Sequence, residues 1–190
     1  DFMFGLIMHD SKYVKPFLEM ILKIKIRKVV YPQSQKSIDL SANAKAIRLD
    51  AYVEDDQNTV FNLEMQTSDN RNLPKRMRYY QGVIDLNILQ KGQDYTKLKK
   101  SYVIFICTFD PFGEGRHIYT FCNTCQENTA LTLDDDAVKI ILSTKGTMDD
   151  VSPEMKRILD YIAGKGASDE YTKQLEEAVR SARQNESWRL

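Results

Sequence analysis

Apolar residues recur at helical spacing in some stretches of the chain and alternate with polar residues in others. Helical spacing predicts helices over 2–8, 11–23, 74–90, 152–162 and 168–187. Alternating or continuous apolar runs predict strands over 24–31, 46–54, 59–67, 101–109, 117–122 and 137–143, with a loop over 32–45. The order of helix, strand, hairpin, helix and buried strand predicts an α/β fold of the mixed α+β kind, with a central mixed sheet flanked by helices.

The run SYVIFICTF over 101–109 is almost continuously apolar, which is typical of a strand covered on both faces. We therefore expect it at the centre of the sheet. Pro74 and Gly92 bracket the preceding helix, because proline favours a first helical turn and glycine favours the position just past an end. The predicted buried stripe of this helix is Met77, Tyr80, Ile84 and Ile88.

The strands over 46–54 and 59–67 flank a polar turn at 55–58, which predicts a β-hairpin. If the apolar residues of both strands face the core, Asp50 lies directly opposite Glu64 on the other face. Opposed side chains have Cβ atoms about 4.5–5.5 Å apart, so two carboxylates there repel each other. A divalent cation would compensate, because Mg²⁺ takes one or two carboxylates and completes its shell with water and substrate phosphate.

A simpler interpretation is that both carboxylates line a solvated sheet face, as acidic residues on polar strand faces commonly do. The spacing of Asp50 and Glu64 alone does not decide between the two interpretations.

The helix over 74–90 begins with a basic turn. Lys75, Arg76 and Arg78 lie where positive charge opposes the helix dipole. A bound phosphate would offset this cost, with Tyr79 beside it. A solvated basic turn, or an ion pair with Asp69, would explain the pattern equally well.

The composition is that of one globular domain, with 190 residues of which 42% are hydrophobic and 28% charged. The formal net charge is zero, so the whole chain is not drawn to nucleic acid. The charge is unevenly spread, however: residues 71–100 are basic and residues 123–160 acidic. A local basic surface is therefore compatible with a neutral chain.

No apolar run approaches the ~20 residues of a membrane span, and the start has no leader pattern, so we expect no membrane. Three cysteines without a secretion signal favour a reducing compartment, the cytoplasm. Cys122 and Cys125 form a lone CxxC, for which a zinc site would need His117 and a further ligand; two reduced cysteines are the simpler interpretation. The sequence is compatible with a homodimer. Both ends read as cut, so we treat the chain as a fragment.

Several long stretches, in order, resemble the recombination-promoting nuclease and transposase family of bacteria, within the PD-(D/E)xK superfamily. They are DFMFG, RLDAYVEDDQNTVFNLEMQ, LPKRMRYYQG, LQKGQDYTKLKKSYVIFICTFDPFG and YTFCNTCQEN. Within them Asp50, Glu64 and Gln66 match a D…ExQ variant of the superfamily motif. The resemblance runs to about residue 165, so we expect a nuclease-like domain over 1–165 and a truncated C-terminal helix over 166–190.

The resemblance implies a restriction-endonuclease-like core and a divalent-metal-dependent DNA endonuclease linked to recombination or transposition. It implies Asp50 and Glu64 as ligands of Mg²⁺ or Mn²⁺, and it puts Gln66 in the place of the motif lysine. A glutamine amide supplies dipolar hydrogen bonds rather than a charge, so catalysis would be weaker or need another cation. Arg76 and Tyr80 belong to the resembling helix, which favours phosphate binding by its basic turn.

Many enzymes of the superfamily carry one more acidic ligand on the first helix. Glu19 is the candidate here, with Asp1 and Asp10 as alternatives. The competing hypothesis for the whole chain is an inactive nuclease fold kept as a DNA-binding or protein-interaction module.

Overall fold

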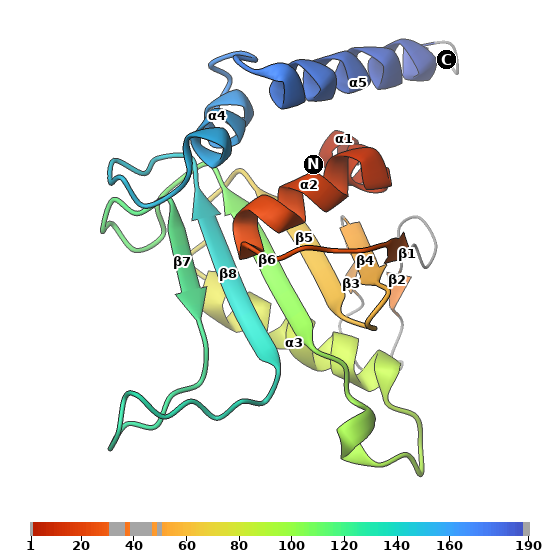
Figure 1. Cartoon of the computed structure of the whole chain (residues 1–190), viewed down its shortest axis with the longest axis vertical. Coiled ribbons are helices and arrows are strands. Elements are labelled where there is room, and N and C mark those ends of the chain that lie inside the picture. Colours follow the sequence, from red (N-terminus) through yellow and green to blue (C-terminus); the bar gives the residue numbers. More distant parts are fainter. Residues whose placement is uncertain (1, 31–36, 39–46, 49–50, 188–190) are drawn as a thin grey trace.

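A six-stranded mixed sheet forms the centre of the molecule, with helices on both faces (Figure 1). The computed structural model describes residues 2–30, 37–38, 47–48 and 51–187. The helices are α1 (Phe2–Met8), α2 (Ser11–Leu22), α3 (Leu73–Ile88), α4 (Pro153–Ile162) and α5 (Glu170–Ser187), with a 3-10 turn η1 (Tyr95–Lys97). The strands are β1 (Val29–Val30), β2 (Ser37–Ile38), β3 (Ile47–Arg48), β4 (Ala51–Asp55), β5 (Val60–Gln66), β6 (Ser101–Cys107), β7 (Ile118–Phe121) and β8 (Ala137–Ser143).

The strand order is β1-β4-β5-β6-β8-β7, while β2 and β3 form a separate two-stranded sheet. The three central strands β5, β6 and β8 run parallel, and the outer pairs are antiparallel. The continuously apolar strand β6 lies between β5 and β8, as its pattern predicts. The predicted fold class, a mixed sheet flanked by helices, is confirmed.

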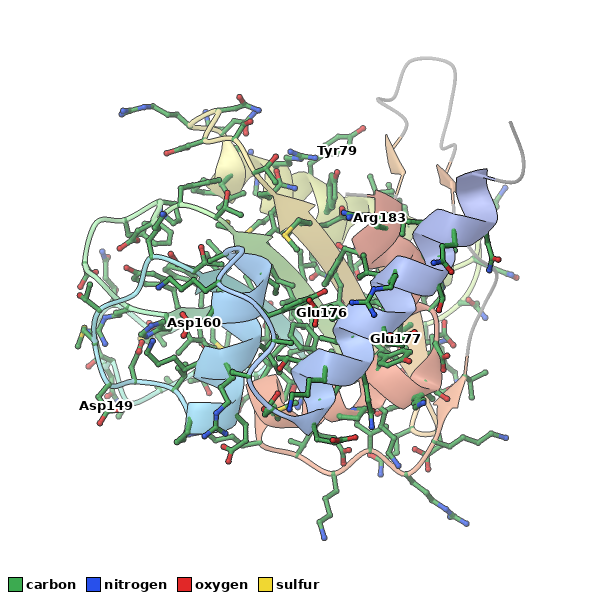
Figure 2. All side chains as sticks on the ribbon, turned by 90° about the horizontal axis from the view of Figure 1, so that it is seen from above. Tyr79, Asp149, Asp160, Glu176, Glu177 and Arg183 are labelled. Atoms are coloured by element: carbon green, nitrogen blue, oxygen red, sulfur yellow. The ribbon has the colours of Figure 1, made fainter. Side chains whose placement is uncertain are left out.

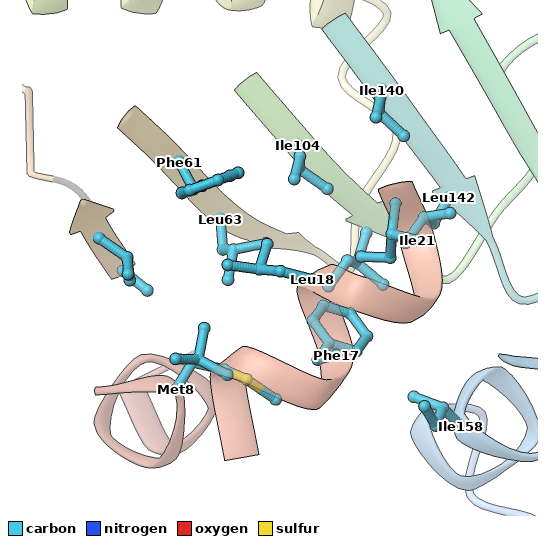
Figure 3. Close-up of a cluster of buried hydrophobic side chains, with 14 of the residues drawn as sticks. Met8, Phe17, Leu18, Ile21, Phe61, Leu63, Ile104, Ile140, Leu142 and Ile158 are labelled. Atoms are coloured by element: carbon cyan, nitrogen blue, oxygen red, sulfur yellow. The ribbon is translucent and has the colours of Figure 1, made fainter. Parts of the chain in front are cut away.

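One face of the sheet packs against α1, α2 and α4 (Figures 1 and 3). From α2, Phe17, Leu18 and Ile21 are buried against strand residues such as Leu63 and Ile104 (Figure 3). The helix α5 rests on α1 and α4, and its Leu175 reaches the same core. Tyr171, Ala178 and Val179 of the same helix pack partly buried against it. The division into a domain over 1–165 and a truncated C-terminal helix over 166–190 stays a prediction.

The opposite face is covered by α3. Its predicted stripe is confirmed, because Met77, Tyr80 and Ile84 are buried and Ile88 packs partly buried against them. The helix crosses residues such as Phe105 of β6. Among the described residues, no helix is both long enough and apolar enough to traverse a lipid bilayer.

Two predicted boundaries were wrong. Among the described residues of the strand predicted over 24–31, only Val29–Val30 pair with β4, and the backbone N–H of Ile26 instead donates to the carboxylate of Glu19 at 3.1 Å. β-branched residues favour a strand only where a partner lies alongside, which local sequence does not specify. The loop predicted over 32–45 contains the short strand β2, which pairs with β3; its other residues lie outside the described ones.

Candidate active site

A tight turn sets the register of the hairpin that carries the predicted metal ligands. The Asp55 side chain accepts hydrogen bonds from the backbone N–H groups of Gln57 (2.9 Å) and Thr59 (2.8 Å). Asn58 takes a left-handed conformation with φ of 63°, which asparagine tolerates better than most residues. The turn therefore fixes how β4 and β5 align.

In this alignment Ala51 pairs with Leu63 and Tyr52 with Asn62. This is the register predicted from the alternation of apolar and polar residues, in which the next pair would be Asp50 with Glu64. Asp50 itself lies outside the described residues, so its pairing with Glu64 stays a prediction.

Three polar side chains of β5 share the face beneath α3. Asn62 is 0% exposed, Glu64 2% and Gln66 7%. They lie on the side of the sheet occupied by Met77 and Tyr80 of α3, in a layer with little contact with water. The interpretation of Glu64 as part of a solvated sheet face is therefore wrong, because α3 covers that face. Burying a charged carboxylate is costly unless specific interactions offset the loss of hydration.

Asn62 holds the carboxylate of Glu64 in place. Its side-chain Nδ2 donates to Glu64 Oε1 at 3.0 Å and to the carbonyl oxygen of Ala51 at 3.3 Å. The other end of the amide, Asn62 Oδ1, is buried and has no hydrogen-bond partner among the described residues. No role was predicted for Asn62 from the sequence, although its spacing of two residues from Glu64 on the same strand was the signal for this contact.

Arg76 of α3 reaches across to Gln66, which was predicted to stand in the place of the motif lysine. One of its terminal nitrogens donates to Gln66 Oε1 at 2.7 Å, and the other donates to the Tyr80 hydroxyl at 3.1 Å. The guanidinium also lies 5.5 Å from the centre of the Tyr80 ring and 5.9 Å from that of Phe105. These contacts hold a permanent positive charge of the helix beside Gln66.

The remaining basic residues at the start of α3 face outward. Lys75 and Arg78 are exposed, and the first turn has no acidic residue to balance them. Within the part of the chain that the structure describes, Asp69 forms no ion pair with them; its carboxylate accepts a hydrogen bond from the backbone of Arg71 at 2.9 Å. Tyr79 lies on the same helix and is 38% exposed.

Glu19, the candidate acidic ligand on the first helices, lies away from Glu64. Glu19 belongs to α2, which packs on the face of the sheet opposite to Glu64, and it binds the backbone of Ile26. The structure therefore does not bring Glu19 together with Glu64. Of the two alternatives, Asp10 caps the start of α2, and Asp1 lies outside the described residues.

The cysteines do not build a metal site in the described residues. Cys122 and Cys125 are free thiols, and no group of three or more His, Cys, Asp or Glu side chains gathers in the described part of the chain. Cys107 pairs with Gln66 across the sheet, but burial raises the pKa of its thiol to about 12, which keeps it neutral. His117, considered for zinc, instead pairs with Asp150.

Asp150 fastens the start of β7. Its carboxylate lies 2.6 Å from His117 Nδ1 and accepts a hydrogen bond from the His117 backbone at 2.8 Å. Burial raises the pKa of Asp150, but the hydrogen bonds from His117 and from the backbone of Ile118 outweigh it, so the pKa lies below its usual value. The stability linked to this depressed pKa is complete above the unfolded-state value of about 3.9 and is lost as the pH falls through the folded value.

Replacing Asp150 by asparagine is therefore expected to lower the free energy of unfolding by about 1–3 kcal/mol near neutral pH, because the amide cannot replace the charged acceptor. The difference from the wild type should shrink as the pH falls below about 4. Urea unfolding over this pH range measures both effects. Asp149→Asn is the matched control, since Asp149 is the exposed neighbour (Figure 2). An equal loss in both variants, or a loss independent of pH, would contradict this role.

Comparison with known protein families gives a match that includes the residues of this site. The family model described as PD-(D/E)XK nuclease family transposase matches residues 2–143. The matched region contains the β4–β5 hairpin and the whole of α3. No curated protein and no solved structure gives a significant match.

Proposed function

Because the chain belongs to the PD-(D/E)XK nuclease family of transposases, we propose that it is a divalent-metal-dependent DNA endonuclease that acts in recombination or transposition of mobile DNA. Family membership supports a nuclease role with DNA as substrate. The observation that supports a metal-dependent endonuclease in particular is the arrangement of side chains at the end of β5. There the buried Glu64 is oriented by Asn62, and Gln66 is bound to Arg76.

The donor atoms fit a hard divalent cation. PD-(D/E)XK nucleases generally use divalent metal ions, and carboxylate and amide oxygens are ligands suited to Mg²⁺ or Mn²⁺. Asp50 and Glu64 would hold the ion, and the unpartnered buried oxygen of Asn62 fits a hydrogen bond from a water molecule of its shell. When bound, the ion would supply Lewis-acid activation of water and neutralise charge on the phosphate.

The protein's own groups would orient the reactants. Arg76 donates a hydrogen bond to the amide oxygen of Gln66. The amide nitrogen of Gln66 could therefore donate to a water molecule or a phosphate oxygen. The fixed guanidinium of Arg76 lies where it would stabilise negative charge that develops on the phosphate. In this proposal Arg76 acts in the reaction centre and the exposed Lys75 and Arg78, with Tyr79, hold the DNA backbone.

Titration of Mn²⁺ and Mg²⁺ against the purified protein and supercoiled plasmid DNA tests this function. We expect nicking that appears with either ion and stops when the ion is chelated. A folded protein that binds DNA without binding Mn²⁺ or cutting would instead identify an inactive nuclease fold that serves as a binding module. The glutamine in place of lysine is the feature that favours this second function.

A further inference from the structure

A pocket of about 310 Å³ opens beside the first turns of α3, between the helix and the β7–β8 edge of the sheet. We call it the aromatic pocket. Its lining includes Pro74, Met77, Phe112, Phe121, Lys139 and Ile141. Its volume is at the lower end of the range of about 300–1,000 Å³ for small-ligand sites, which suits one flat group rather than a long segment.

Two phenylalanine rings stand at the pocket with much of their surface in contact with solvent. Phe112 is 38% exposed and Phe121 45% exposed, and their ring centres lie 5.4 Å apart. Phe112 also packs edge-on against Tyr119, with 4.8 Å between the ring centres. Single exposed apolar residues are common, whereas a cluster of them lining a pocket indicates a binding site.

The loop that presents Phe112 is well fixed. Asp110 accepts a hydrogen bond from the Tyr119 hydroxyl at 2.8 Å and others from the backbone of Phe112 (3.1 Å) and Gly113 (3.0 Å). The Phe112 ring is therefore held in place before any ligand arrives, which reduces the entropy lost on binding.

The sheet register connects the aromatic pocket to the candidate active site. Glu64 pairs with Phe105, and Phe105 pairs with Ile141, so Glu64 and the pocket residue Ile141 lie in one row across β5, β6 and β8. Strands are spaced about 4.8 Å apart, so two steps cover about 10 Å. Both sites lie on the sheet face that α3 covers, with the basic first turns of the helix beside them.

We propose that the aromatic pocket receives one unstacked nucleobase of the DNA substrate, next to the phosphate that is cut. The proposal rests on the proposed function. Bases of any sequence stack on aromatic side chains, and Lys139 in the lining with Lys75 and Arg78 outside it matches the negative charge of the attached backbone. An aliphatic peptide would gain nothing from these cations. The protein would consequently prefer DNA with an unpaired base near the cleavage site.

Fluorescence of 2-aminopurine tests the proposal without catalysis. The probe is placed as an unpaired base in an otherwise paired duplex, and wild-type protein is added in the presence of a chelator. We expect quenching of the probe and tighter binding than to the fully paired duplex. Phe121→Ala should remove the quenching and weaken binding of the unpaired substrate about tenfold, with little change for paired DNA.

Two further variants make the test specific. Phe112→Leu keeps apolar bulk but removes a ring, and we expect it to reduce quenching as well. Leu133→Ala is the matched control, because Leu133 is an exposed apolar residue on the β7–β8 connection, which follows Phe121, but lies outside the lining. Circular dichroism verifies that each variant is folded.

Several outcomes overturn the aromatic pocket as a base-binding site: no quenching by the wild type, equal losses for paired and unpaired DNA, or the same loss in Leu133→Ala. Plasmid cleavage is assayed in parallel with Mn²⁺. Cleavage by a wild type that does not quench the probe overturns the pocket alone. Quenching that depends on Phe121 in a protein that never cuts supports the pocket and overturns only the nuclease.

Discussion

Replacing Glu64 by glutamine is expected to lower metal-dependent DNA cleavage on the order of 10³-fold while the protein stays folded. Glutamine has nearly the same shape but lacks the negative charge that a divalent cation requires. Asn62 Nδ2 would still find an oxygen to donate to, so the local structure should survive. Asp50→Ala is expected to lose cleavage to a similar extent.

Thermal unfolding with and without Mn²⁺ separates loss of metal binding from loss of fold. An ion that binds only the folded state stabilises it, by about 2.7 kcal/mol at a hundred times its Kd. The wild type should therefore gain stability from Mn²⁺ and Glu64→Gln should not. Glu54→Gln is the control on the same hairpin, because the Glu54 side chain is 20% exposed and pairs with Lys99 at 3.2 Å. Cleavage by Glu64→Gln at the wild-type rate would refute the assignment.

Introducing the common motif lysine at position 66 is expected to lower DNA cleavage and stability. In Gln66→Lys the new ammonium would meet Arg76, whose nitrogen lies 2.7 Å from the present Gln66 oxygen. Two like charges in this poorly solvated place repel each other and lose the hydrogen bond. We expect cleavage to fall about 10²-fold and the free energy of unfolding to fall by about 1–3 kcal/mol.

The double variant Gln66→Lys/Arg76→Gln moves the cation from the helix to the strand. It is expected to cleave DNA better than either single variant, which a double-mutant cycle on kcat/KM would show as coupling. Arg78→Gln is the matched control on α3. Because Arg78 is exposed, its replacement should weaken DNA binding and make that binding less dependent on salt. It should show no coupling to position 66. Wild-type cleavage in Gln66→Lys alone would show that Arg76 does not take the lysine's place.

The sequence predicted the parts of the fold that local pattern controls. Alternation along the hairpin gave its register, and the apolar run of β6 gave its central place. The buried stripe of α3 was also correct. Each of these depends on the period of apolar residues within one segment, which the chain displays directly.

The sequence could not show which face of the sheet α3 would cover. That pairing decides whether Glu64 is solvated or buried, and it depends on contacts between segments rather than within one. For the same reason the bond from Arg76 to Gln66 was not foreseen, and Arg76 was assigned to phosphate binding with its exposed neighbours. Glu19 was chosen by position along the chain, but the helix that carries it packs on the other face.

The row that joins Glu64, Phe105 and Ile141 has a consequence for the newly made protein. Its members come from three parallel strands, each separated from the next by a long connection, and parallel pairing of this kind forms slowly. Until the last of these strands docks, neither the carboxylate environment nor the neighbouring pocket is complete. If the protein is the nuclease proposed above, a chain still emerging from the ribosome should therefore leave DNA intact, and cutting would begin only with the finished molecule.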